Sequence, residues 1–386
     1  MKKLINKLFI IILFLFAFGE IIRLDFGNGV FLKPLDIGVG IVVFLWLIFK
    51  FAKKEKIKQK NIYIPLLLFA GLGFLSLLIN YSSLTIIQFF VSLMYLIRWV
   101  TYAGIFFVVL DFNKDYSRLI SKLLIIVGSL IVVFGYLQYF LYSNLRNLYY
   151  LGWDEHMYRM FSVFLDPNFA GTFFVLFFLF LVNIFLKNKS VLIGLLSILT
   201  LGAVFLTFSR SALIMLIVSA SVLFILLNKK ILIVLLLVII LAVLAISSRY
   251  FNIENINLFR IVSSEARIET AKSAILIAEK SLLVGVGFNA YRYAQFRYGL
   301  RNEVNIASHA DASPDNSFLF VIATTGIVGF ILYLFLWFKM FRVVSALGIA
   351  SILGVFINSM FINSLFYPFI MLWLWIILAL SIKSHN

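Results

Sequence analysis

Residues 190–230 read SVLIGLLSILTLGAVFLTFSRSALIMLIVSASVLFILLNKK. Two apolar runs flank a short polar turn at Ser209-Arg210-Ser211, and the run over 191–208 shows none of the period-two alternation of a half-buried strand. Each run is close to the roughly 20 residues that a helix needs to cross the hydrocarbon core of a bilayer. Because only helices and closed barrels satisfy their backbone groups in lipid, this stretch predicts two membrane helices joined by a tight turn.

Similar apolar runs recur along the whole chain. Hydrophobic residues make up 63% of it and charged residues only 13%, which leaves too little polar surface to cover a water-soluble globule. The sequence therefore predicts an all-α, polytopic transmembrane helix bundle in one membrane domain, residues 1–386, with about twelve spans. The predicted spans are 8–23, 35–52, 62–80, 84–110, 118–142, 169–187, 190–208, 211–228, 231–247, 316–338, 344–364 and 367–382.

The positive charges favour one orientation of this bundle. If every predicted span crosses, most of the 33 lysines and arginines fall in alternate short loops, and by the positive-inside rule those loops and both termini are cytoplasmic. The first span is expected to be retained, because no small-x-small cleavage pattern follows it. The net charge of +17 does not indicate nucleic-acid binding, since the basic residues lie between apolar spans. With no cysteine, disulfides, thiolate metal sites and a cysteine nucleophile are excluded.

Residues 248–315 are too polar to cross the membrane and form the predicted long extracytoplasmic segment. Two serines before Glu265 indicate the start of an amphipathic helix. Its predicted apolar face consists of Ile268, Ala271, Ile275 and Ala278. Gly285 and Gly287 then predict a turn with a close backbone approach, because no strand and helix of a dinucleotide-binding unit surround them.

The end of this segment holds the candidate proton-transfer residues. Ser313 as N-cap and Pro314 at the first helical position predict a helix start that places Asp315 and Asn316 on the first turn. Asp315 either complements the helix dipole or acts as a base, and the same dipole would favour its carboxylate form and weaken it as a base. His309 is an equal candidate for proton transfer, with an ordinary loop residue as the alternative.

Three arginines have positions that need an explanation. Arg210 lies in the tight turn at the membrane boundary, where its fork of donors suits a pyrophosphate, although a snorkelling arginine would lie there too. Arg159 lies in a second outer loop, which ends where Asp166 caps a helix starting at Pro167. It either joins the same site as Arg210 or is an ordinary surface charge. Arg98 lies near the middle of a predicted span, where an unpaired charge is costly. It is expected to face the protein interior and to have a structural partner within the bundle, although no acid in the neighbouring spans is an obvious one.

In combination these features resemble the O-antigen ligase and O-antigen polymerase family of bacterial membrane glycosyltransferases. The resemblance is carried by the turn Ser209-Arg210-Ser211-Ala212, by Arg267-Ile-Glu-Thr, by Gly285 and Gly287, and by Asp315-Asn316 followed by Gly326-Ile-Val-Gly329. It covers roughly residues 150–340. In this chain an aspartate stands where the family has a histidine, which favours a polymerase or an unassigned relative over a strict lipopolysaccharide ligase.

The resemblance implies an enzyme of the bacterial inner membrane that needs no metal or other cofactor. It would move a glycan from an undecaprenyl-pyrophosphate carrier to a hydroxyl of a glycan, lipid or protein acceptor on the extracytoplasmic side. The residues it implies are Arg210, Arg267 and Arg159 for the pyrophosphate, and Asp315, His309 and Asn316 around the acceptor hydroxyl. The rival hypothesis is a transporter or flippase of polyprenyl-linked saccharides, which would show related halves and broken helices near the midplane.

Overall fold

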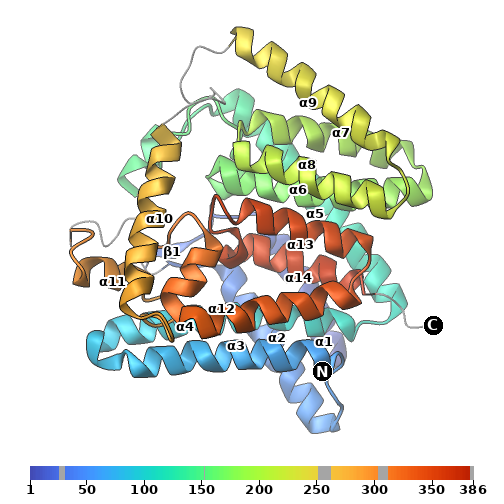
Figure 1. The fold of residues 1–386 in the computed structure, drawn as a ribbon. Helices are drawn as coiled ribbons and strands as arrows, with labels where there is room; N and C mark the ends of the chain where they lie inside the picture. Colours follow the sequence, from blue (N-terminus) through green and yellow to red (C-terminus); the bar gives the residue numbers. More distant parts are fainter. Residues whose placement is uncertain (26–30, 152, 251–261, 303–311, 383–386) are drawn as a thin grey trace.

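The structure is a computed structural model that describes the chain except residues 26–30, 152, 251–261, 303–311 and 383–386. It is all-helical, as predicted, apart from one two-stranded hairpin (Figure 1). The helices of the first half are α1 (Lys2–Phe16), α2 (Pro34–Lys53), α3 (Lys60–Ile79), α4 (Ile86–Leu110), α5 (Lys114–Leu141) and α6 (Pro167–Asn188). Those of the second half are α7 (Val191–Leu206), α8 (Arg210–Leu226), α9 (Ile231–Tyr250), α10 (Val262–Lys280), α11 (Tyr291–Arg297), α12 (Ser317–Val343), α13 (Ala346–Asn358) and α14 (Pro368–Leu380).

Short elements connect the helices. The strands β1 (Leu24–Asp25) and β2 (Phe31–Leu32) pair antiparallel between α1 and α2, with Leu24 opposite Leu32. The 3-10 turns are η1 (Tyr81–Ser83), η2 (Arg146–Leu151), η3 (Ser162–Phe164) and η6 (Ser364–Phe366).

Six helices in the described part of the chain are long and apolar enough to cross a membrane, namely α2, α3, α4, α5, α6 and α12. Shorter apolar helices are α7, α8, α13, α14 and residues Ile231–Ala242 of α9. Every predicted span overlaps a helix, but the first one, 8–23, continues past the end of α1 at Phe16. Among the described residues the chain is thus a helical bundle with six candidate membrane-spanning helices, and the count of twelve spans stays a prediction.

The bundle has two distinct ends. At one, α10 and α11 lie across the ends of the other helices (Figure 1), and the backbone N–H of Asp315, just before α12, donates to Thr270 Oγ1 of α10 at 3.4 Å. The last turn of α3 also lies there, since Asn80 Nδ2 donates to the Gly285 carbonyl at 2.9 Å. We call this the α10 end.

The opposite end is the lysine end. It contains Lys58, just before the start of α3, together with the start of α1 and the last turns of α2 and α4. A bridge between Val344 and Ile382 brings the end of α14 to the far end of α12. The first and last described residues therefore lie at this same end.

Two glycine-containing segments interlock at the α10 end. Helix α12 is broken at Gly326, whose φ is +67°. The turn before α11 enters this break, and Gly287 N–H donates to the Thr324 carbonyl at 3.1 Å. A Cβ on Gly285 would lie 2.3 Å from Thr324 C, and one on Gly326 would lie 2.2 Å from Leu283 O. The predicted close backbone approach at Gly285 and Gly287 is confirmed.

The centre of the bundle is packed with aromatic rings. Helices α6 and α14 are enclosed along most of their length. The rings of Phe173 and Trp373 meet edge to face at 4.9 Å, and Phe16 of α1 packs against both. This rigid centre fixes the loop that follows α5 and the start of α6 at the α10 end.

Arg98 has the partner that the sequence did not reveal. Its NH2 group donates to Asp36 Oδ2 and to the Phe31 carbonyl, both at 2.8 Å. Asp36 also accepts from the Tyr102 hydroxyl at 2.7 Å. Asp36 is thus the structural partner expected for Arg98 within the bundle. It was not an obvious candidate, because it lies on the first turn of α2 inside an apolar run.

Candidate functional site

The turn that carries Arg210 is built by side-chain caps. Ser209 is the N-cap of α8, and its hydroxyl accepts a hydrogen bond from Ala212 N–H at 3.4 Å. The same hydroxyl donates to Asn168 Oδ1 of α6 at 3.0 Å. Arg210 is therefore the first residue of α8, and its backbone is fixed against the start of α6.

Arg159 lies directly against this turn. It is buried, and its Nε donates to the Thr207 carbonyl at 2.9 Å. Its NH2 group donates to Asn168 Oδ1 at 3.4 Å and to the Phe208 carbonyl at 3.5 Å. These bonds connect the outer loop to the residues before Arg210, so Arg159 holds the turn in place whatever else it binds.

Asp166 brings a carboxylate to the same place. It is the N-cap of α6 with Pro167 at the first helical position, as predicted, and its Oδ1 accepts from Asn168 N–H at 2.6 Å. Its Oδ2 lies 4.0 Å from His156 Nε2. His156 was missed in the sequence, and the available signal was that it is one of three histidines and shares the outer loop with Arg159.

Helix α10 presents Arg267 and Thr270 toward the bundle. Both lie on the same face as the fully buried Ala274 and Ile277. The predicted apolar face is divided between two sides of the helix, because Ala278 is buried whereas Ile268 is 55% exposed and Ile275 is 47% exposed. The face that packs on α12 mixes small, apolar and polar side chains. Helix α10 starts at Val262, which agrees with the predicted start.

Arg267 of α10 and Asp315, which precedes α12, shift each other's pKa. Burial lowers the pKa of the Arg267 guanidinium, Asp315 opposes this, and Arg210 lowers the pKa further. Burial raises the pKa of the Asp315 carboxyl, Arg267 opposes this, and Asp166 adds to the rise. The structure thus brings Arg210, Arg267, Asp315 and Asp166 within electrostatic range of one another.

The predicted helix start before α12 is corrected. The N-cap is Asn316 and not Ser313, and its Oδ1 accepts from Phe318 N–H at 2.9 Å and Leu319 N–H at 3.0 Å. Asp315 therefore precedes the helix, and burial outweighs the dipole effect that was expected to favour its carboxylate form. Asn316 also donates through Nδ2 to the Met360 carbonyl at 3.2 Å, which fixes this corner to the segment after α13. His309 lies outside the described residues.

A cavity of about 150 Å³ adjoins this charged group. Arg98 and Asn289 are among its polar lining residues, and its walls are largely aromatic. Phe169, three residues after Asp166, and Ser313, two residues before Asp315, both line it. An aromatic wall with a few polar groups suits a sugar ring, which offers both apolar faces and hydroxyls.

The arrangement can bind an anion and accept a proton in one place. Because Arg210 lowers the pKa of Arg267, an anionic group such as a pyrophosphate beside Arg267 would stabilise its charged form. A carboxylate whose pKa is raised is a better proton acceptor than an ordinary surface aspartate. Perturbed groups of this kind cluster at functional sites more often than elsewhere.

Comparison with known families agrees with this geometry. The family model described as O-antigen ligase matches residues 195–334, which run from α7 into α12 and include Arg210, Arg267, Asp315 and Asn316. No curated protein matches the chain. This match and the apolar helices support an O-antigen ligase/polymerase-type assignment for the part of the chain that the family model covers.

Proposed function

We propose that the protein transfers a glycan from an undecaprenyl-pyrophosphate donor to an acceptor hydroxyl on the extracytoplasmic side of the bacterial inner membrane. The observation that carries this proposal is that Asp315 and Arg210 both lie close enough to Arg267 to act on its charge. A cation pair beside a carboxylate provides the two functions that such a transfer needs, since one part stabilises the leaving pyrophosphate and the other receives the acceptor proton.

In this mechanism the acceptor oxygen attacks the anomeric carbon of the donor glycan. A new glycosidic bond forms, the bond from the anomeric carbon to the pyrophosphate oxygen breaks, and the electron pair leaves with the pyrophosphate. Arg210 and Arg267 stabilise the charge that develops there. Asp315 takes the hydroxyl proton, and His309 stays an alternative acceptor for it. A single displacement inverts the anomeric centre.

Arg159 and Asn316 have supporting roles in this proposal. Arg159 keeps the turn before Arg210 in position through the Thr207 and Phe208 carbonyls. Asn316 caps α12 and fixes the chain next to Asp315. Both are positioning residues, and their replacement is expected to lower the rate by moving Arg210 or Asp315.

The sidedness of the proposal rests on charge. The lysine end carries the basic loops that the positive-inside rule assigns to the cytoplasm. The α10 end then faces outward, toward flipped lipid-linked donors. The exposed apolar side chains of α10, including Ile268 and Ile275, suit a helix that rests on the outer leaflet.

The transporter hypothesis has one feature in its favour, because α12 is broken at Gly326. In transporters such breaks line a binding site near the membrane midplane. Here the break is filled by the backbone of the turn before α11, with Ile327 N–H donating to the Leu282 carbonyl at 2.8 Å and Val286 N–H to the Ala323 carbonyl at 3.0 Å. A filled break supports a fixed corner of an enzyme site better than a moving gate.

The test is a transfer reaction with the purified full-length chain in proteoliposomes. Lipid-linked oligosaccharide and its acceptor glycan, both extracted from the native membranes, are expected to yield free undecaprenyl pyrophosphate and extended product. Arg210→Ala is expected to lower the rate by roughly 100-fold or more, as for loss of a group that stabilises a leaving charge. The matched control is Arg297→Ala, because Arg297 is exposed on α11 at the same end, and it should retain the wild-type rate.

Two results would overturn the proposal. Movement of the donor across vesicles with no change of any bond would mean transport. Equal losses in Arg210→Ala and Arg297→Ala would mean that Arg210 has no special part in the reaction. Product length then separates the subclasses, because a polymerase gives a ladder of repeats and a ligase gives a single addition.

A further inference from the structure

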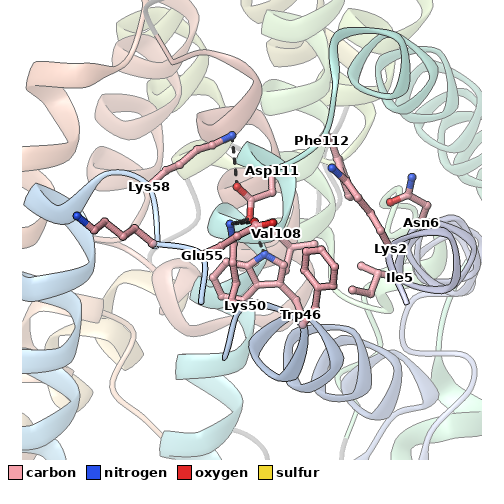
Figure 2. Close-up of a pocket in the computed structure, with 12 residues that line it drawn as sticks. Lys2, Ile5, Asn6, Trp46, Lys50, Glu55, Lys58, Val108, Asp111 and Phe112 are labelled. Atoms are coloured by element: carbon pink, nitrogen blue, oxygen red, sulfur yellow. Dashed lines mark hydrogen bonds and ion pairs between the residues drawn. The ribbon is translucent and has the colours of Figure 1, made fainter. Parts of the chain in front are cut away.

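A second cavity lies at the lysine end of the molecule, far from the site described above. It has a volume of about 290 Å³ and is formed by the start of α1, the last turn of α2, the end of α4 and the segment that leads into α3 (Figure 2). We propose that this cavity binds the phosphate headgroup of an anionic phospholipid. The proposal depends on the bundle lying in a membrane and does not depend on glycan transfer.

The cavity has an excess of positive charge. Four lysines line it, Lys2, Lys50, Lys56 and Lys58, against two carboxylates. Asp111 is already shared, since it accepts from Lys50 at 2.6 Å, from Trp46 Nε1 at 2.8 Å and from Lys58 at 3.3 Å. The wall therefore attracts an anion and leaves no carboxylate to neutralise the remaining lysines.

Lys2 and Lys56 are the lysines available to a ligand. Both are exposed, and among the described residues neither has an ion-pair partner. Lys50, by contrast, is buried and also contacts Glu55 at 3.1 Å. Figure 2 shows Lys50, Glu55 and Asp111 as one connected group, with Lys2 apart from it. The wall thus combines a fixed charged base with cations that can close over a phosphate.

The shape and place of the cavity favour a lipid over a soluble anion. Its lining includes apolar side chains such as Ile5, Phe49 and Phe112 beside the lysines. It lies where α2 and α4, both long and apolar enough to cross a membrane, come to an end. Basic pockets between membrane helices on the cytoplasmic side are suited to acidic headgroups, whose phosphate meets the lysines while the glycerol and acyl chains meet the apolar wall.

The test is native mass spectrometry of the full-length protein in detergent, titrated with phosphatidylglycerol or with phosphatidylcholine. Phosphatidylglycerol is expected to bind the wild type at least about fivefold more tightly, because each nearby lysine favours an anionic headgroup by roughly that factor. The double variant Lys2→Gln/Lys56→Gln should weaken phosphatidylglycerol binding about 25-fold, at roughly fivefold for each lysine lost. Lys2→Arg/Lys56→Arg should keep binding, which separates loss of charge from loss of structure.

The matched control is Lys3→Gln/Lys53→Gln. These two lysines are exposed on α1 and α2, do not line the cavity and change the net charge by the same amount. The control should bind phosphatidylglycerol within about twofold of the wild type. Equal binding of the two lipids, an equal loss in the control, or displacement of phosphatidylglycerol by millimolar inorganic phosphate would each overturn the proposal, the last by identifying a free-phosphate site.

Discussion

The α10 end and the lysine end both hold cations beside carboxylates, but they arrange them differently. At the lysine end, Asp111 is shared among Lys50, Lys58 and the Trp46 indole, so the charges compensate one another. At the α10 end, Arg267 faces Asp315 and also a second cation, Arg210, and burial disfavours its charge. The first arrangement stabilises helix ends. The second places a like charge beside Arg267, and the proposed binding of a pyrophosphate would offset that charge.

Removing one carboxylate at each end should separate these roles most clearly. Asp315→Asn is expected to lower the transfer rate by about 10²- to 10⁴-fold, the usual contribution of a general base, while the protein still folds. Asp111→Asn should leave the rate within a few-fold of the wild type. Steady-state rates on both purified variants provide the measurement. If His309→Gln is inactive and Asp315→Asn is active, the proton acceptor has been assigned to the wrong residue.

The stability of the protein should depend on Gly326, the glycine in the break of α12. Gly326→Ala is expected to destabilise the protein by about 3 kcal/mol, because its φ of +67° is unfavourable for alanine and the added Cβ would lie 2.2 Å from Leu283 O. Gly71→Ala in α3 is the control, since nothing lies within 4 Å of its Cβ. Thermal unfolding in detergent would compare them, and equal stability of the two variants would argue against the interlock.

Substitutions at the lysine end should lower the stability of the protein and leave its transfer activity largely unchanged. Asp111→Ala is expected to cost about 2 kcal/mol, because the buried Lys50 and the Trp46 indole both lose an acceptor. Lys58→Gln should cost less than about 1 kcal/mol, since its side chain is 59% exposed and Asp111 keeps its other partners. Denaturation midpoints of the two variants would test this, and a larger loss for Lys58→Gln would contradict the network as described.

The smallest effects are expected in the pH dependence of transfer. The rate needs the Asp315 carboxylate, so it falls as pH drops through the pKa of that group. Asp166 raises this pKa and Arg267 lowers it. Asp166→Asn, which keeps an N-cap for α6, should move the acid limb of the rate profile to lower pH. Arg267→Gln should move the limb of its residual activity to higher pH. Shifts in the same direction would mean that Asp315 does not control the limb.

Much of this organisation could be predicted from the sequence because it follows from local rules. Apolar run length located the helices, and Asp166 before Pro167 identified the start of α6. The resemblance, carried by the order of short motifs, pointed to Arg210, Arg267 and Asp315 as one group, which the structure brings within electrostatic range.

The features that could not be predicted from the sequence depend on contacts between distant segments. Asp36 pairs with Arg98, 62 residues away, and nothing local in either helix announces the pair. The inward face of α10 is set by how closely it packs on α12, so small Ala274 lies inside and Ile275 outside. Ser313-Pro314 is a strong local signal for a helix start. The N-cap of α12 is nevertheless Asn316, three residues later, because Asn316 can also reach the Met360 carbonyl.

The proposed transfer requires that the α10 end face the outside of the cell. The chain contains no cysteine, so single-cysteine variants can be made directly. Arg297→Cys marks the α10 end and Lys58→Cys marks the lysine end, and both positions are exposed. In spheroplasts, a membrane-impermeant maleimide is predicted to label Arg297→Cys and to label Lys58→Cys only after lysis. Labelling of Lys58→Cys alone in unlysed spheroplasts would place the arginines and Asp315 in the cytoplasm and contradict the proposed transfer.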